Sequence, residues 1–182
     1  MKVLIIYADG FEDVEALATR DVLIRSKIEV TDVKINENSQ IVTSSHNLSL
    51  IGFFDMKKVN INEYEAIILP GGSRGVNNLL ASGEVISLVR EFAKKDKLVC
   101  AICAAPMVLS KAGLLKDKKF TCYPGCEEGL EGIYTGEEVV VLDKMITARS
   151  MMYSIPFGLA IIEKLLGKEK REQIYKQISG LY

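Results

Sequence analysis

The stretch Leu98-Val99-Cys100-Ala101-Ile102-Cys103-Ala104-Ala105-Pro106 decides the fold. Its first five residues form an apolar run with the length of a buried strand, and Pro106 suits the first turn of a following helix, where its missing N–H is not needed. A strand that turns directly into a helix presents the residue between them, Cys103, beyond the strand's carboxyl end, as in the nucleophile turn of α/β hydrolases. We expect the helix N-terminus to favour the thiolate and to lower the pKa of Cys103. A buried, inert cysteine would give the same pattern.

Apolar runs alternate with helical patterns along the rest of the chain. Strands are expected at 2–8, 28–35, 66–69 and 98–102, and helices at 11–26, 76–81, 84–95 and from 106 to about 112. A turn-rich segment at 36–40 precedes residues 41–54, which favour short antiparallel strands, and a short strand at 120–122 precedes a glycine-rich segment at 125–136. A hairpin over 138–147 and helices at 155–166 and 168–178 complete the chain. Near-continuous apolar strands alternating with helices predict an α/β fold with a doubly wound, mostly parallel sheet sandwiched by helices.

Length and composition favour one ordinary globular domain over residues 1–182. The chain has 182 residues, 48% hydrophobic and 26% charged, which excludes disorder as the main theme. Its net charge of -1 gives no field that would attract nucleic acid or an anionic membrane. The longest apolar run, 98–109, is too short to span a bilayer, and the first residues lack the features of a signal peptide. We therefore expect a cytoplasmic protein without nucleic-acid or membrane partners.

The histidine and cysteine counts restrict the possible chemistry. His46 is the single histidine, which excludes multi-histidine metal centres, and its polar surroundings at 43–47 predict a solvated loop side chain. The spacing of Cys100-x2-Cys103 and Cys122-x3-Cys126 approximates a four-thiolate zinc site. We favour free thiols and no metal, because successive strand residues point to opposite faces and 99–102 is too apolar for a zinc knuckle.

Glu15 is expected to face the core. At about 100° per residue, Phe11, Glu15, Ala18 and Val22 lie on one stripe of the first predicted helix. A buried carboxylate must find hydrogen-bond donors or keep its proton with a raised pKa. The alternative is an exposed first-turn glutamate stabilised by the helix dipole.

Pro70-Gly71-Gly72 follows the third predicted strand and suggests an anion-binding turn. A glycine pair lets the backbone approach a ligand and leaves amides free for developing negative charge. In open α/β sheets ligands bind just outside the carboxyl ends of the strands. Glu15, the glycine pair and Cys103 all fall beyond such ends, so we expect them to form one site.

Several segments together resemble the DJ-1/ThiJ/PfpI superfamily, and most of all its DJ-1 branch. The resemblance runs nearly end to end through Lys2–Ile5, Asp9–Glu15, Ile67–Gly72 and Ala101–Pro106, and continues in Tyr123-Pro124-Gly125 and Ile146–Ser150. The Leu-Pro-Gly-Gly and Ala-Ile-Cys-Ala-x-Pro segments are the most specific parts.

This resemblance implies a fold, a site and a function. The fold is flavodoxin-like, also described as class I glutamine amidotransferase-like, in a homodimer. Cys103 is the reactive thiol, Glu15 its carboxyl partner, and the backbone at Gly71, Gly72 and Ala104 binds the oxyanion. The implied function is that of a cofactor-free stress protein that acts on reactive carbonyls as a glyoxalase III or deglycase, turning methylglyoxal into lactate. The alternative is a redox sensor or chaperone-like protein whose Cys103 is oxidised to the sulfinate.

Two departures from the family pattern limit what can be transferred. Protease-like branches have histidine directly after the cysteine, where this chain has Ala104, so a peptidase is not expected. Many DJ-1-branch members have histidine where this chain has Tyr123, and a phenol titrating near 10 is a poor general base at neutral pH. Tyr123 and Arg149 are our pocket candidates.

Overall fold

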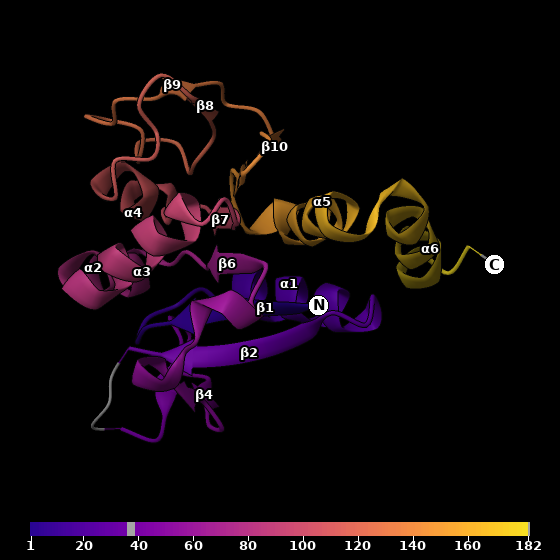
Figure 1. The fold of residues 1–182 in the computed structure, drawn as a ribbon, viewed down its shortest axis with the longest axis horizontal. Helices are drawn as coiled ribbons and strands as arrows, with labels where there is room; N and C mark the ends of the chain where they lie inside the picture. The colour runs from indigo at the N-terminus through magenta and orange to yellow at the C-terminus, as the bar shows by residue number, and fades with distance from the viewer. Residues whose placement is uncertain (36–38, 182) are drawn as a thin grey trace.

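The computed structural model describes residues 1–35 and 39–181, and within them a seven-stranded sheet forms the centre of the molecule (Figure 1). The strand order is β10-β11-β7-β6-β1-β2-β5. The strands are β1 (Lys2–Tyr7), β2 (Glu29–Lys34), β5 (Phe54–Asp55), β6 (Ala66–Leu69), β7 (Leu98–Ile102), β10 (Val139–Val141) and β11 (Met145–Ala148). All neighbours pair in parallel except β10, which runs antiparallel to β11. The predicted α/β class with a mostly parallel sheet is confirmed.

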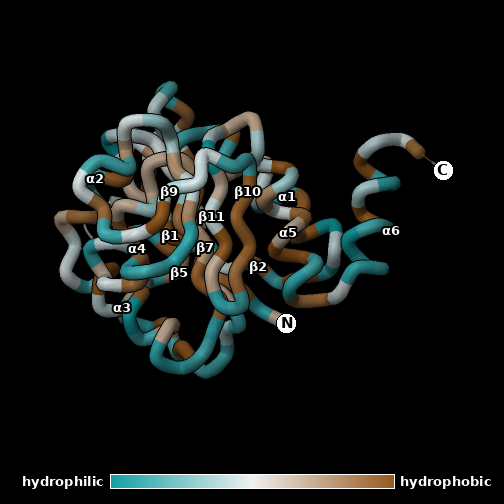
Figure 2. Tube along the Cα trace, turned by 90° about the horizontal axis from the view of Figure 1, so that it is seen from above, coloured by the Kyte–Doolittle hydropathy of each residue, from teal (hydrophilic) through white to brown (hydrophobic). Residues whose placement is uncertain are grey.

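Helices cover both faces of the sheet. They are α1 (Asp13–Arg25), α2 (Ser73–Ala81), α3 (Gly83–Lys94), α4 (Pro106–Lys111), α5 (Ser154–Leu166) and α6 (Lys168–Ser179). Figure 2 shows α2, α3 and α4 on one side of the strands and α1 and α5 on the other, with α6 beyond α5. The short 3-10 helices are η1 (Met56–Lys58), η2 (Ile61–Glu63) and η3 (Met151–Tyr153). Among the described residues there is no helix with both the length and the hydrophobicity to cross a membrane.

Strand periodicity builds the two halves of the core. In β1, Leu4 and Ile6 pack with α2, α3 and α4, whereas Val3, Ile5 and Tyr7 pack with α1 and α5. All five side chains are at most 1% exposed. Each buried aliphatic side chain contributes about 1.5–3 kcal/mol, so a strand that is apolar at every position is stable only between two helical layers.

Helix α1 begins at a defined cap. The Glu12 carboxylate accepts a hydrogen bond from the Glu15 backbone N–H at 2.7 Å. Asp13 and Glu15 lie in the first turn and Arg25 in the last, the charge order that the helix dipole favours. The cap fixes the start of the helix and therefore the side to which Glu15 points.

Two small sheets lie outside the central one. β3 (Val42–Thr43) and β4 (Ser49–Leu50) form the expected antiparallel pair. The next strand, β5, adds in parallel to the edge of the main sheet instead. β8 (Lys119–Phe120) pairs in parallel with β9 (Ile133–Tyr134), a strand not predicted within the glycine-rich segment. Of the turn-rich segment predicted at 36–40, positions 36–38 lie outside the described residues.

Candidate active site

Cys103 occupies a sharp turn between β7 and α4. Its backbone has φ 64°, in the left-handed region that residues other than glycine rarely adopt. The Cys103 N–H donates to the Ala148 carbonyl at 2.8 Å, which ties the turn to the neighbouring strand β11. The thiol is partly exposed, and Ala104 and Ala105 beside it are small and buried. The strand-to-helix elbow therefore presents this sulfur at the carboxyl edge of the sheet, as the sequence predicts.

Glu15 reaches the same point from α1. It is 1% exposed, and its Oε2 accepts a hydrogen bond from the Gly71 N–H at 2.9 Å. The carboxyl group also hydrogen-bonds the Cys103 thiol. A Cβ at Gly71 would lie 2.4 Å from Glu15 Oε2 and 2.7 Å from Cys103 Cβ, so only glycine fits between them. The structure brings together the acid, the thiol and the glycine turn that the sequence places at one edge.

The environment holds a proton on Glu15. Burial raises the pKa of this carboxyl from 4.5 to about 7, against the lowering effect of the bonds from Cys103 and Gly71. For Cys103, burial and then the Glu15 carboxylate raise the thiol pKa, while the amides of Ala104 and Gly72 lower it. The effect of Glu15 on Cys103 depends on charge, because a protonated carboxyl donates to the sulfur and stabilises a thiolate. The two groups titrate as a coupled pair.

The predicted lowering of the Cys103 pKa by a helix N-terminus is wrong. Helix α4 begins at Pro106, beyond the turn at Cys103, and is six residues long. Burial is the largest effect on this thiol, and it raises the pKa.

The oxyanion corner has two free amides rather than three. The amides of Gly72 and Ala104 are directed at the Cys103 sulfur. Gly72 has φ 91°, and a Cβ there would lie 2.4 Å from the Gly10 carbonyl oxygen. The Gly71 amide is already engaged by Glu15, so Gly71 holds the acid in place instead of offering a third donor.

A cavity of about 580 Å³ opens beside the thiol. Helix α2 contributes Ser73, Val76 and Asn77, the elbow and α4 contribute Cys103, Ala104 and Met107, and the loop contributes 123–126 and Glu128. Tyr123, one of the two pocket candidates, lines it and is 52% exposed. Ser73 and Asn77 are not among the residues predicted for the site, although their spacing of one helical turn directly after the glycine pair indicates them.

Arg149 lies elsewhere and does not line this cavity. Its guanidinium donates to the Gly136 carbonyl at 2.8 Å, hydrogen-bonds the Tyr153 hydroxyl and lies over the Tyr153 ring. Its prediction as a pocket residue is corrected: it ties the loop after β9 to η3.

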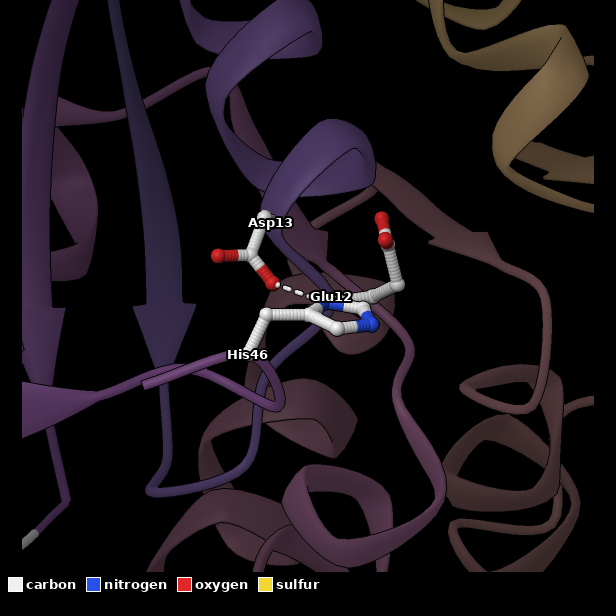
Figure 3. A group of neighbouring side chains, drawn as sticks. All are labelled: Glu12, Asp13 and His46. Atoms are coloured by element: carbon white, nitrogen blue, oxygen red, sulfur yellow. Dashed lines mark hydrogen bonds and ion pairs between the residues drawn. The ribbon is translucent and has the colours of Figure 1, made fainter. Parts of the chain in front are cut away.

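Glu12, Asp13 and His46 form a second polar cluster, at the start of α1 and the turn after β3 (Figure 3). His46 Nδ1 lies 2.7 Å from Asp13 Oδ2, so this histidine has a partner rather than being only solvated. Within the described chain, this is the one set of three His, Cys, Asp or Glu side chains with ligand atoms close together. Glu12 caps α1 and Asp13 accepts from Ser44, so both carboxylates are already used structurally.

The four cysteines do not converge. Although all four lie in the described part of the chain, no three bring their sulfurs together, and Cys100 and Cys122 are fully buried. This geometry overturns the four-thiolate zinc alternative.

The comparisons with known proteins agree with this arrangement. The model of the DJ-1/PfpI family matches residues 1–164. The chain is 34% identical to Protein dj-1beta of Drosophila melanogaster over 98% of this chain and 97% of that protein. The crystal structure of Drosophila melanogaster DJ-1beta superposes with a TM-score of 0.91 at 32% identity, covering 98% and 97% of the two chains.

Two further relatives are similar over nearly all of this chain. It is 35% identical to Protein DJ-1 homolog B of Arabidopsis thaliana over 96% of its own length, which spans 40% of the plant protein. It is 28% identical to Glutathione-independent glyoxalase DJ-1 of Schizosaccharomyces pombe, covering 98% of both. With the sheet, the elbow thiol and the family match in agreement, the chain belongs to the DJ-1/PfpI family.

Proposed function

We propose that the protein is a cysteine-dependent, cofactor-free glyoxalase that converts small 2-oxoaldehydes to 2-hydroxy acids, with methylglyoxal giving lactate. The observation that carries the proposal is the hydrogen-bonded Cys103–Glu15 pair, in which the thiol lines a cavity and the acid is buried behind it. The name of the Schizosaccharomyces pombe relative supports the same chemistry. No metal, nicotinamide or glutathione enters the scheme.

The first step uses the thiol and the two free amides. The Cys103 thiolate attacks the aldehyde carbon, a C–S bond forms, and the carbonyl oxygen becomes the oxyanion of a hemithioacetal. In this step the negative charge moves from the sulfur to the oxygen. The amides of Gly72 and Ala104, which stabilised the thiolate, then stabilise the oxyanion.

The second step uses Glu15 as a proton shuttle. Glu15 first gives its proton to the hemithioacetal oxyanion, and the resulting carboxylate then removes the proton from the former aldehyde carbon. That proton returns to the neighbouring carbon through an enediol while the hydroxyl proton passes to the second oxygen, which gives a thioester of the hydroxy acid. Water then hydrolyses the thioester, releases lactate and restores the thiol. A carboxyl with a pKa of about 7 both accepts and donates protons readily at neutral pH.

The test is lactate formation from methylglyoxal by purified variants. Cys103→Ala is expected to abolish turnover, and Glu15→Gln to lower kcat/KM by about 10²–10⁴-fold. Cys100→Ala is the matched control, because it removes a fully buried thiol from β7, the strand that leads into the Cys103 turn. It is expected to keep the wild-type rate. Lactate formation by the Cys103→Ala protein at the wild-type rate would refute the scheme.

A second candidate function, redox sensing, is favoured by the exposure of the same thiol. Cys103 is partly exposed, and a protonated Glu15 beside it is placed to donate a hydrogen bond to a sulfinate oxygen. Selective addition of two oxygens to Cys103 under mild peroxide, in a protein without measurable turnover, would favour sensing over catalysis.

A further inference from the structure

We propose that Cys126 is a resolving thiol: after a hydroperoxide oxidises Cys103 to the sulfenic acid, Cys126 captures it as an intramolecular disulfide. The inference goes beyond the proposed glyoxalase activity and rests on the position of two thiols around one cavity. It assigns a modification site to a loop residue that the proposed turnover does not use.

Burial selects this pair among the four cysteines. Cys100 and Cys122 are 0% exposed, so neither is open to a peroxide or to a partner in solution. Cys103 and Cys126 are partly exposed, and both line the cavity of about 580 Å³. They are the two thiols that face a common space.

Backbone contacts bring the Cys126 turn to the elbow. The Tyr123 N–H donates to the Cys103 carbonyl at 2.8 Å, and the Cys126 N–H donates to the Tyr123 carbonyl at 2.9 Å. Cys126 is therefore one tight turn away from the residue that is bonded to Cys103. A disulfide requires the two Cα atoms to come within about 4.4–6.8 Å, so the turn must close over the cavity.

The turn has room for that movement. Gly125 has φ 93° and Gly129 has φ 77°, and a Cβ at either position would meet no atom within 4 Å. Residues 121–132 carry neither helix nor strand. A shift of this loop toward Cys103 gives up part of the packing of Cys126 and Leu130 against the core.

Glu127 lies in the same turn, and its charge acts on the thiols of Cys122 and Cys126. Its carboxylate accepts from the Gly125 N–H at 2.6 Å and lies 4.0 Å from the Cys122 sulfur. Burial, and then the charge of Glu127, raise the pKa of Cys126. Cys126 thus stays a thiol at neutral pH, and its attack accelerates as the pH rises and its thiolate forms.

The chemistry balances in two steps. In the first, the Cys103 sulfur displaces the leaving group of the hydroperoxide: the O–O bond breaks, an S–O bond forms, and an alcohol or water leaves. In the second, the Cys126 sulfur attacks the sulfenic sulfur: an S–S bond forms, the S–O bond breaks, and hydroxide leaves as water with the Cys126 proton. The two thiols together give two electrons to the peroxide. A disulfide formed this way intercepts Cys103 before a second peroxide makes the irreversible sulfinate.

The experiment is peptide mapping of the full chain after one molar equivalent of hydrogen peroxide, with free thiols blocked by N-ethylmaleimide. The wild-type protein is expected to yield a Cys103–Cys126 cross-linked peptide, with the intact monomer lighter by two hydrogens. Cys126→Ser is expected to lose the cross-link and to accumulate two added oxygens on Cys103 several-fold faster. Cys122→Ser is the matched control, because it removes the neighbouring buried thiol and should retain the cross-link.

Two results would overturn the proposal. One is wild-type Cys103 carrying one or two oxygens while Cys126 is still fully blocked by N-ethylmaleimide. The other is a cross-link that joins Cys126 to Cys122 or to a second chain. Neither result depends on methylglyoxal turnover, so the resolving thiol and the glyoxalase can fail separately.

Discussion

Glu15 is a buried titratable residue, so its contribution to the free energy of unfolding should depend on pH. Its pKa in the fold is about 7, above the ordinary 4.5, so the folded state binds a proton more tightly than the unfolded chain. The resulting stabilisation is present below about pH 4.5 and is lost as pH rises through about 7. The shift corresponds to roughly 3 kcal/mol.

Urea unfolding of the wild type and of Glu15→Gln between these pH values tests that expectation. The difference in free energy of unfolding between the two proteins should change by roughly 3 kcal/mol across the range, because the amide does not titrate. A constant difference at every pH would show that Glu15 titrates in the fold as it does in the unfolded chain.

Gly71 is the position where an added methyl group should perturb the geometry of the site most. An added Cβ would lie 2.4 Å from Glu15 Oε2 and 2.7 Å from Cys103 Cβ, so Gly71→Ala must push the acid and the thiol apart. We expect a loss of about 1–3 kcal/mol in stability and a much larger relative loss of methylglyoxal turnover. Gly83→Ala is the control, since a Cβ there meets nothing within 4 Å. Wild-type turnover in Gly71→Ala would mean that the pair tolerates displacement.

At the residue level, the sequence was informative where periodicity applied. Helical phase placed Glu15 in the core, and the strand–helix junction placed Cys103 at the edge. The sequence could not show that the Gly71 amide donates to Glu15 or that Arg149 hydrogen-bonds Tyr153, because these contacts depend on distant segments. The predicted direction of the Cys103 pKa was wrong for a related reason, since burial, which depends on distant segments, raises it.

Helix α2 packs against the loop after β1 through a glycine in its first turn. A Cβ on Gly75 would lie 2.8 Å from the Phe11 nitrogen and 2.9 Å from the Gly10 carbonyl oxygen, both rigid backbone atoms. Alanine is the better helix former by about 1 kcal/mol, but overpacking costs about 1–3 kcal/mol. Gly75→Ala should therefore lower the urea midpoint, whereas Gly83→Ala in α3 should hold or raise it. An unchanged or raised midpoint for Gly75→Ala would show that the loop after β1 can move to accommodate the added methyl group.

The elements themselves were largely predictable. Buried parallel strands are short apolar runs and amphipathic helices repeat every 3.6 residues, so both leave a pattern in the sequence. β9 could not be found, because two residues, Ile133 and Tyr134, pair with β8 across a glycine-rich loop and leave no period. The parallel addition of β5 to β2 was missed for the same reason.

Apolar side chains exposed near α1 suggest how two molecules would meet. Ile51 is 76% exposed, Met152 75% and Ile155 44%, and α1 packs on α5 where Thr19 donates to the Ser154 carbonyl. Such side chains in one region are typical of an interface. We therefore keep the homodimer that the family resemblance implies as a proposal, with this region as its contact surface.

Light scattering after size-exclusion chromatography measures that assembly. The wild type is expected to elute with twice the chain mass, and Met152→Glu to shift toward the monomer, because a charge would be buried at the contact. Lys176→Gln, on the polar helix α6, lowers the net charge by the same one unit and is the charge-matched control, which should stay dimeric. A wild type that is monomeric at micromolar concentrations would rule the dimer out.

The strand order β7-β6-β1 sets the distance between acid and sulfur, because each of these neighbouring strands delivers one component of the pair and its glycine spacer. Backbone ladders hold adjacent strands about 4.8 Å apart, so the sheet fixes the spacing of the three strand ends. The Glu12 cap and the absence of a side chain at Gly71 then let the acid reach the sulfur. One wall of the cavity, in contrast, is the irregular loop that contains residues 123–128. Relatives could thus exchange that wall, and with it the molecules admitted, while the chemistry behind it stays the same.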